Sequence, residues 1–312
     1  MKYRRLGRTG LTVSVVGFGA WQFGGEWGKE FSQAEVNDLL SRAKARGINL
    51  IDTAECYGDH LSERLIGNFV KDQRDDWLIA TKFGHKFTGH LQRAELWAAD
   101  EVRQQLEDSL RALQTDVIDL YQFHSGTDAA FDNDELWTML NKQVQAGKIR
   151  HLGVSVSSGF NPDYQIGRAV EVGAEAIQIV FNRLDRQPEA TALPLCRQHD
   201  LGVLARVPLA SGFLSGKYKP GTEFTNSSDV RASHDRAKVQ ARLREVAEIE
   251  QNEVPPGVPM AAWALAWCLQ HPAVTCVIPG CKTPAQVDSN VVAADLDMVT
   301  GDHPQAVPPP PG

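Results

Sequence analysis

Eight short apolar runs, separated by stretches with helical spacing, organise the chain along most of its length. The runs cover residues 13–19, 48–52, 77–82, 117–124, 151–155, 176–180, 202–207 and 275–279. Helical patterns lie between several of them, as at residues 34–46, 100–113, 135–146 and 189–199. Runs of this length joined by helices indicate parallel strands with crossover helices. Eight strands without a sequence repeat favour an α/β fold of the closed (β/α)8 TIM-barrel type over a doubly wound sheet.

Local signals indicate one domain with extensions at both ends. Residues 2–5 and 11–15 flank a Gly-Arg-Thr-Gly turn, which predicts an N-terminal β-hairpin ahead of the barrel. We expect a single barrel domain over residues 1–300. Residues 301–312, which end in four prolines and a glycine, are expected to form a disordered tail. Residues 211–233, rich in Gly, Ser and Thr, predict a long loop after the seventh strand, and such loops often act as lids.

The composition narrows the class of protein and of partner. The 42% apolar content of the 312 residues supports a full core, and the net charge of −7 gives no reason to expect nucleic acid or an anionic membrane as partner. No apolar stretch reaches the ~20 residues that cross a bilayer, and no signal-peptide pattern follows Met1. The five cysteines are scattered and include no Cys-x-x-Cys pair, which indicates reduced thiols. We therefore expect a cytoplasmic protein, and the sequence leaves its oligomeric state open.

Polar residues stand at the ends of three consecutive apolar runs. Asp52 ends the second run, Lys82 the third and His124 the fourth. Tyr57 lies five residues after Asp52, in the segment Asp-Thr-Ala-Glu-Cys-Tyr-Gly. In a parallel barrel the carboxyl ends of the strands form one rim, where such enzymes carry their chemistry. Each residue alone has an ordinary structural explanation, such as a helix cap, a packed aromatic ring or a lysine that reaches solvent. Together at one rim they favour catalysis.

The four side chains suit the reduction of a carbonyl group, in which an oxygen is protonated while hydride reaches carbon. Tyrosine can donate that proton, although its ordinary pKa of ~10 makes it a weak acid at neutral pH. We expect the Lys82 ammonium to lower the pKa of Tyr57, and Asp52 to act as the counter-ion of the buried lysine. His124 is expected to lie beside the carbonyl oxygen, orienting it and sharing its proton.

Other types of site fail on spacing. The glycines at positions 17 and 19 are not followed by the third glycine of a dinucleotide-binding G-x-G-x-x-G motif. The segment 212–217 is one residue short of a phosphate-binding P-loop, and no Ser or Thr follows its lysine. His85 and His90 lie five residues apart without a supporting cluster of Cys or carboxylate residues, so we expect no metal. The Gly-x-Ser-x-Gly motif of serine hydrolases is absent.

In their order these segments resemble the aldo-keto reductases, NAD(P)H-dependent carbonyl reductases built on a (β/α)8 barrel. The resemblance covers about residues 3–295 and extends to Gly153-Val154-Ser155, the strand with Gln178, and segments 208–212 and 279–290. It points to a bacterial-type member, similar also to potassium-channel β subunits.

The resemblance implies reduction of an aldehyde or ketone to an alcohol, with Tyr57 as general acid. Its implied catalytic tetrad is Asp52, Tyr57, Lys82 and His124. The alternative is a nicotinamide-binding regulatory or partner-binding module with weak turnover. Turnover distinguishes the two, because both can share an intact tetrad.

A cofactor, NADPH in preference to NADH, is expected across the barrel rim, with its phosphates at the loops after strands seven and eight. Ser155 and Gln178 are placed for the carboxamide, and Phe181 for stacking on the nicotinamide ring. Lys282 lies where the family reads the phosphate that distinguishes NADPH, and Gln286 stands where an arginine is frequent. The predicted cofactor contacts are Gly19, Ala20, Trp21, Asp52, Ser155, Gln178, Phe181, Pro208, Leu209, Ser211, Gly212, Leu214, Lys217, Gly280, Lys282, Thr283, Gln286 and Asn290.

Three departures from the family pattern lie on the cofactor side. Val156 stands where many members carry asparagine, Phe181 where many carry tyrosine, and Arg206 with Val207 where an aromatic residue and a serine are frequent. On the substrate side, aromatic residues predict an apolar cleft, open and of broad carbonyl acceptance. The predicted substrate contacts are Trp21, Tyr57, Phe87 and His124. The sequence leaves the physiological substrate and the direction of the reaction open.

Overall fold

Eight parallel strands form the centre of the molecule in the computed structural model, which describes residues 1–157 and 162–310. In chain order they are β3 (Phe18–Gly19), β4 (Leu50–Asp52), β5 (Leu78–Phe83), β8 (Ile118–His124), β9 (Ile149–Ser155), β10 (Ala174–Val180), β11 (Gly202–Arg206) and β12 (Cys276–Val277). Each strand pairs with its neighbour in this order. Backbone hydrogen bonds from Gly17 to Val277 (2.8 Å) and from Gly19 to Pro279 (3.0 Å) also join the segments at the two edges. The sheet therefore curls round into a barrel.

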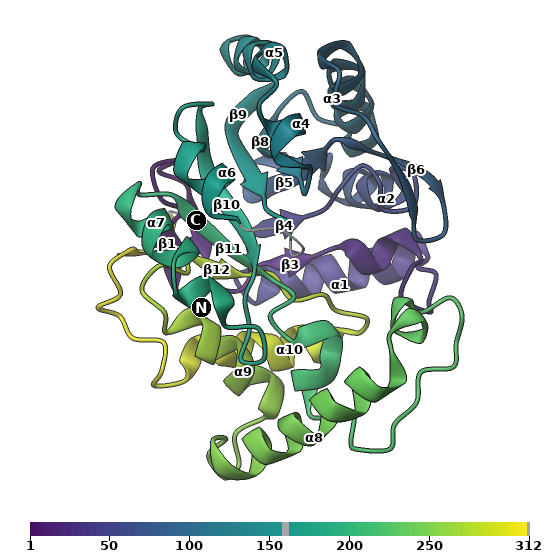
Figure 1. Cartoon of the computed structure of the whole chain (residues 1–312), viewed down its shortest axis with the longest axis vertical. Coiled ribbons are helices and arrows are strands. Elements are labelled where there is room, and N and C mark those ends of the chain that lie inside the picture. The colour runs from purple at the N-terminus through teal and green to yellow at the C-terminus, as the bar shows by residue number, and fades with distance from the viewer. Residues whose placement is uncertain (158–161, 311–312) are drawn as a thin grey trace.

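Helices lie round the outside of this sheet (Figure 1). They are α1 (Gln33–Ala45), α2 (Leu61–Val70), α3 (Ala99–Leu113), α4 (Asp128–Phe131), α5 (Asp134–Gln145), α6 (Asp163–Arg168), α7 (Ala192–Gln198), α8 (Arg236–Asn252), α9 (Met260–Leu269) and α10 (Pro284–Val291). Helix α1 illustrates why they pack there. Its buried residues are Val36, Leu39, Leu40 and Ala43, the spacing that puts apolar side chains on one face of a helix. A capping box between Ser32 and Glu35 starts the helix.

The interior of the barrel is closed at the amino-terminal ends of the strands. Leu50, Ala80, Leu120 and Leu204 pack there with other strand residues, and Leu6 of the N-terminal hairpin joins the same cluster. That hairpin pairs β1 (Tyr3–Arg5) with β2 (Thr12–Ser14) in antiparallel fashion, as the sequence predicted. With this end plugged by apolar side chains, the carboxyl ends of the strands are left as the place for a cavity.

The C-terminal segment corrects the prediction of a disordered tail over residues 301–312. Ala306 and Val307 form β13 (Ala306–Val307), which pairs with β1, so the two ends of the described chain lie side by side (Figure 1). The backbone of Arg5 donates to Gln305 O (2.8 Å), and Thr275 Oγ1 donates to Gln305 Oε1 (2.7 Å). These partners are far away along the chain, so the proline-rich composition did not reveal them. Residues 311–312 lie outside the described residues.

Two further elements shape the carboxyl-terminal rim. A hairpin that the sequence analysis did not predict, β6 (His85–Gly89) and β7 (Gln92–Glu95), follows β5 directly. The predicted long loop at residues 211–233 contains the short helices η4 (Ala210–Ser215) and η5 (Val230–Ser233). Its residues contact the segment after β3: Gly28 N donates to Ser228 O (2.9 Å), and Val230 N donates to Glu26 O (3.1 Å). The loop is thus tied across the rim.

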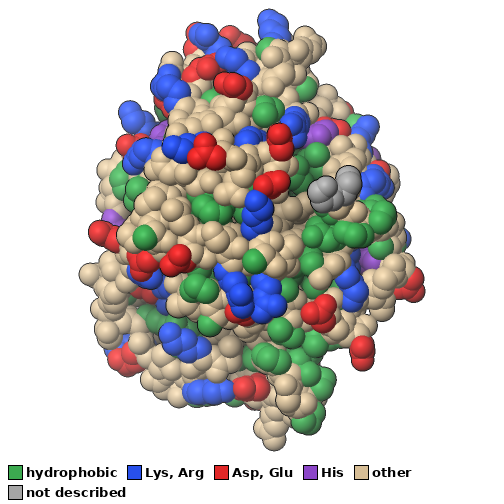
Figure 2. Space-filling model, turned by 180° about the vertical axis from the view of Figure 1, so that it is seen from behind, with side chains coloured by type: hydrophobic (Ala, Val, Ile, Leu, Met, Phe, Trp, Pro, Cys, Tyr) green, Lys and Arg blue, Asp and Glu red, His purple; other side chains and the backbone are tan. Residues whose placement is uncertain are grey.

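The outer surface carries charges of both signs. On the face seen from behind, acidic and basic side chains are interspersed (Figure 2). None of the helices in the described part of the chain is long and apolar enough to cross a membrane.

Candidate active site

The ends of β4, β5 and β8 bring the predicted tetrad together. Lys82 Nζ donates to Asp52 Oδ1 at 2.8 Å and to the backbone oxygen of Thr53 at 2.6 Å. The same ammonium lies 3.5 Å from the Tyr57 hydroxyl oxygen. The rings of Tyr57 and His124 are 6.2 Å apart and meet edge to face. One buried ammonium therefore connects the carboxylate with the phenol.

A network of amides holds Asp52 in place. Gln178 Nε2 donates to Asp52 Oδ2 at 2.6 Å, and Gln122 Nε2 donates to the same oxygen at 3.1 Å. Gln122 was missed in the sequence, although a signal existed. It lies two residues before His124 on β8, and alternate residues of a strand share a face. Ser155 lies beside this network, with its hydroxyl 3.5 Å from Gln178 Oε1.

Burial dominates the electrostatics of the tetrad. It raises the pKa of Tyr57 to about 12, against the opposing effect of the Lys82 ammonium. The expected lowering by Lys82 is thus present but outweighed. Burial also acts to lower the pKa of Lys82, but Asp52 and Tyr57 prevail and that pKa is raised. Burial, assisted by Lys82, holds the pKa of His124 well below its ordinary value, so its imidazole is neutral at pH 7.

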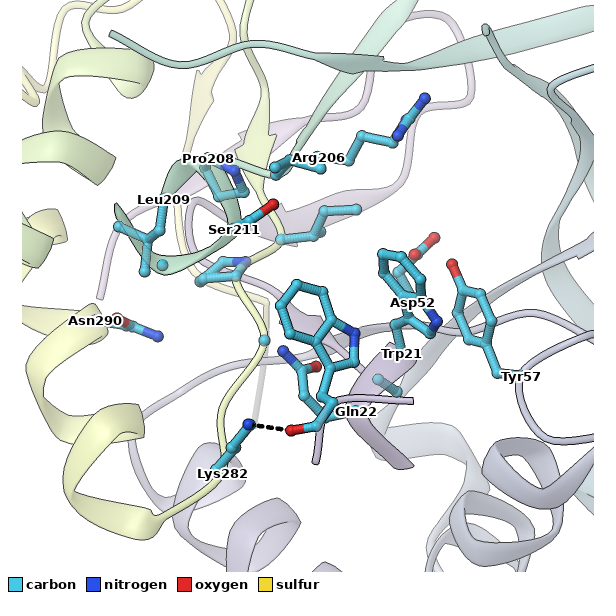
Figure 3. Close-up of a pocket in the computed structure, with 18 of the residues that line it drawn as sticks. Trp21, Gln22, Asp52, Tyr57, Arg206, Pro208, Leu209, Ser211, Lys282 and Asn290 are labelled. Atoms are coloured by element: carbon cyan, nitrogen blue, oxygen red, sulfur yellow. Dashed lines mark hydrogen bonds between the residues drawn. The ribbon is translucent and has the colours of Figure 1, made fainter. Parts of the chain in front are cut away.

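A cavity of about 490 Å³ opens above the tetrad at the carboxyl ends of the strands. Figure 3 shows that it has two ends: Asp52 and Tyr57 lie at one, and Lys282 and Asn290 at the other. The indole of Trp21 lies at the first end, stacked beside Tyr57. We call the first the reaction end and the second the phosphate end. A long cavity with a phenol at one end and a cation at the other suits an extended anionic ligand.

Comparison with known proteins identifies the family of this chain. The model of the family described as "Aldo/keto reductase family" matches residues 15–305. The chain belongs to the aldo/keto reductase family. This finding confirms the resemblance that the order of the sequence segments indicated.

Relatives of the chain include bacterial and plant proteins. The "Uncharacterized oxidoreductase YqkF" of Bacillus subtilis (strain 168) is 30% identical, over 98% of this chain and 95% of that protein. A "Probable voltage-gated potassium channel subunit beta" of Arabidopsis thaliana is 29% identical, over 95% of this chain and 92% of that protein. Among solved structures, the holo form of aldo-keto reductase AKR11C1 from Bacillus halodurans gives a TM-score of 0.79 at 31% identity, over 97% of this chain and 94% of that chain.

Most of the predicted site residues line the cavity. At the reaction end and along the wall they are Gly19, Ala20, Trp21, Asp52, Tyr57, His124, Ser155 and Gln178. Toward the phosphate end they are Pro208, Leu209, Ser211, Gly212, Lys217, Gly280, Lys282, Gln286 and Asn290. Lys82 lies beneath this surface with no exposed area and acts through its contacts with Asp52 and Tyr57.

Four predicted contacts do not line the cavity. Phe181 is fully buried and packs against Trp267 and His271 in the helical layer. The reason is strand geometry: Gln178 faces the barrel, and a residue three positions later faces away. Leu214 is buried in the cluster beneath α8 and α9, where the loop folds back on itself.

The other two have local structural roles. The Thr283 side chain accepts a hydrogen bond from the backbone N–H of Gln286 and so caps α10. Phe87 lies in the hairpin, with the Arg93 guanidinium 5.2 Å from its ring centre.

Arg206 is a cavity residue that the sequence analysis treated only as a departure from the family pattern. Figure 3 shows its guanidinium extending toward the reaction end. Nη2 donates to the backbone oxygen of Val156 at 3.1 Å, and Nε has no hydrogen-bond partner among the described residues. No carboxylate in the described part of the chain forms an ion pair with it. Burial lowers its pKa from the ordinary arginine value.

At the phosphate end, Lys282 contacts the loops that cross the rim. Its ammonium donates to the backbone oxygen of Trp27 and lies 3.9 Å from Asp229 Oδ2. The Asp229 carboxylate is more closely bonded to Arg231, which donates to Oδ1 at 2.9 Å and to Oδ2 at 2.7 Å. Burial lowers the pKa of Lys282, with Asp229 opposing. The lysine therefore keeps a charge that is only partly compensated by a carboxylate.

Glu26, which the sequence analysis missed, fixes the mouth of the cavity. Its buried carboxylate accepts hydrogen bonds from Trp21 Nε1 (2.8 Å), from Arg93 Nη2 (2.6 Å) and from the backbone N–H of Leu91 (2.9 Å). Trp21 in turn stacks on Tyr57 with ring centres 5.9 Å apart. One carboxylate thus connects the hairpin to the indole that stacks on Tyr57.

Proposed function

We propose that this protein reduces aldehyde or ketone carbonyls to alcohols with NADPH. One observation carries the proposal: Lys82 Nζ joins Asp52 (2.8 Å) to the Tyr57 hydroxyl (3.5 Å) at the reaction end of the cavity. Membership of the aldo/keto reductase family supports it, because it makes an oxidoreductase the expected activity.

Tyr57 is the proton donor in this proposal. Its pKa of about 12 keeps the hydroxyl protonated at neutral pH, as a general acid must be. As the proton leaves for the carbonyl oxygen, the Lys82 ammonium stabilises the phenolate that remains. Asp52 keeps that ammonium charged, although both side chains are almost fully buried. Neutral His124 donates a ring N–H to the same carbonyl oxygen and holds it toward Tyr57.

The cavity has groups suited to a nicotinamide dinucleotide. Two buried polar atoms that face it, Gln22 Oε1 and Arg206 Nε, lack partners among the described residues and would gain them from a ligand. Ser155 and Gln178 offer a hydroxyl and an amide for the carboxamide. Ser211 and the N-terminus of α10 offer donors for phosphate. When bound, NADPH supplies the hydride.

We assign the preference for NADPH over NADH to Lys282. The two dinucleotides differ by one phosphate, and an ammonium at the phosphate end attracts that phosphate. Lysine lacks the bidentate fork of arginine, so discrimination is moderate. Neutral Gln286, which lines the same end, adds no charge.

The substrate side supports an open pocket with broad carbonyl acceptance. Trp21, Tyr57 and His124 surround the place for the carbonyl, and the wall beyond them mixes apolar and charged groups. Five free cysteines, all buried, suit the cytoplasm, which we propose as the location.

A second candidate is a nicotinamide-binding module whose main role is to bind a partner. The relative named as a probable potassium channel β subunit favours keeping it. Steady-state assays distinguish the two: NADPH absorbance is followed with a panel of aldehydes and ketones, for wild type and Tyr57→Phe. A sustained decline that requires Tyr57 supports the enzyme. Tight NADPH binding with no turnover on the panel would leave the binding module as the better account.

A further inference from the structure

Four potential metal ligands converge beside the reaction end, on the side of His124. Each offers one nitrogen, sulfur or oxygen atom, and all four atoms lie within 4.8 Å of one another. They come from the loop after β4, the start of β6 and the end of β8, and are Glu55, Cys56, His85 and His124. From the sequence we expected no metal, because His85 has no supporting cluster of Cys or carboxylate residues close to it along the chain. The fold brings the other three ligands close to His85 at the barrel rim.

The separations between these ligand atoms are close to those of a tetrahedral ion site. His124 Nδ1 lies 3.8 Å from Cys56 Sγ and 3.8 Å from Glu55 Oε1. Zinc bonds of ~2.0–2.1 Å to nitrogen or oxygen and ~2.3 Å to sulfur put tetrahedral ligand atoms roughly 3.3–3.6 Å apart. The ring centres of His85 and His124 are 4.9 Å apart, and a ring nitrogen of His85 lies within 4.8 Å of the other three ligand atoms. Contraction by about an ångström completes the shell.

Glu55 gives an independent reason to expect a cation. Its carboxylate is 2% exposed, and only Oε1 has a donor, the backbone N–H of His85 at 3.0 Å. Oε2 is buried without a hydrogen-bond partner among the described residues. A buried carboxylate oxygen without a partner is costly, and a bound cation removes that cost. The nearby Arg93 guanidinium is already held by both oxygens of Glu26, so it does not serve Glu55.

We propose that Glu55, Cys56, His85 and His124 form a zinc-binding site at the barrel rim. The mixture of one thiolate, two imidazoles and one carboxylate selects a borderline ion such as Zn²⁺ over Mg²⁺ or Ca²⁺. Binding releases the Cys56 thiol proton, because zinc takes the thiolate. A metal on His124 Nδ1 leaves the ring proton on Nε2 and so fixes the tautomer of this histidine. The site does not depend on the proposed function.

Direct metal binding tests the proposal without any turnover. The full-length protein is stripped with a chelator, the chelator is removed, and Zn²⁺ is titrated in competition with a chromophoric indicator. We expect one site per chain. Cys56→Ala and His85→Gln should each weaken it at least ~10- to 100-fold. Matched controls are Cys196→Ala, a buried cysteine on α7, and His90→Gln, an exposed histidine near the same hairpin, and both should bind as wild type does.

Cobalt gives a second readout. Co²⁺ bound through Cys56 produces a thiolate-to-metal charge-transfer band in the near ultraviolet, which should persist in His90→Gln and vanish in Cys56→Ala. Thermal unfolding of each variant confirms that it is folded. The proposal is overturned if the wild type shows no stoichiometric zinc site, if both ligand variants bind like wild type, or if the thiolate band survives in Cys56→Ala.

Discussion

Two lysine–aspartate pairs, one at each end of the cavity, stand in opposite surroundings. Lys82 lies 2.8 Å from Asp52, and their side chains are 1% and 5% exposed. Lys282 lies 3.9 Å from Asp229, and their side chains are 29% and 10% exposed. Asp52 and Lys82 lie at the ends of β4 and β5, at the barrel rim. Lys282 lies just before α10, and Asp229 lies in a loop. A buried, closely bonded ammonium stabilises a neighbouring group, whereas a looser one stays available for a charged ligand.

The largest effect should come from Tyr57, the proposed proton donor beside the buried pair. Tyr57→Phe removes the hydroxyl and is expected to lower kcat by ~10²–10⁴-fold, because general acid catalysis supplies that much. NADPH affinity, measured by quenching of tryptophan fluorescence, should change little. More than a tenth of wild-type turnover, with chemistry limiting, would show that Tyr57 is not the acid.

Stability should separate the two lysines next. Lys82→Met leaves Asp52 buried without its counter-ion and should reduce the free energy of unfolding by ~3–5 kcal/mol. Lys282→Met is the matched control, and loss of this more distant, partly exposed pair should cost less than ~1 kcal/mol. Urea unfolding measures both. Equal losses would mean that the difference in burial between the two pairs has no energetic consequence.

For cofactor affinity, in contrast to stability, we expect the marked loss at Lys282. Lys282→Ala is expected to weaken NADPH binding by ~10- to 100-fold, the value of a charge-assisted hydrogen bond, and to leave NADH almost unchanged. Titration with each dinucleotide gives the two Kd values. Equal weakening of both would assign Lys282 to the shared pyrophosphate or to holding Trp27, whose backbone oxygen it contacts.

The smallest expected effect is a gain. Gln286→Arg adds a cation at the start of α10, where the present side chain accepts a hydrogen bond from the Lys282 backbone at 2.6 Å. An exposed charge contact contributes up to ~1 kcal/mol, so NADPH affinity should rise by up to ~5-fold relative to NADH. The ratio of the two Kd values measures it. A rise that is the same for both dinucleotides would place the new guanidinium away from the distinguishing phosphate.

The residues at the ends of the strands were the ones that the sequence could predict. The tetrad was predictable because the carboxyl ends of parallel strands meet at one rim, so residues far apart in the chain were placed together by topology alone. Gln122 was within reach of the same argument, since it shares the strand face of His124. Phe181 was predicted to face the cofactor. It lies three residues after Gln178, so the period of two points its side chain out of the barrel.

Features built by long-range contacts were not predictable from local patterns. Glu26 matters through Arg93 and Leu91, which a hairpin absent from the sequence analysis brings to it. Order in residues 301–310 comes from pairing with the opposite end of the chain, which composition does not encode. The strand alternation thus positions the reaction end, whereas the phosphate end and the mouth depend on how loops fold across the rim.

The most direct test of the central claim is a product-resolved single-turnover measurement. Enzyme in excess over NADPH is mixed with an aldehyde, and both NADPH loss and alcohol formation are quantified for wild type and Tyr57→Phe. The account predicts one alcohol formed per NADPH consumed by wild type, and neither event on the same timescale in the variant, although both proteins bind NADPH. Equal alcohol formation by the two proteins, or none by a wild type that binds NADPH across a panel of aldehydes and ketones, would contradict it.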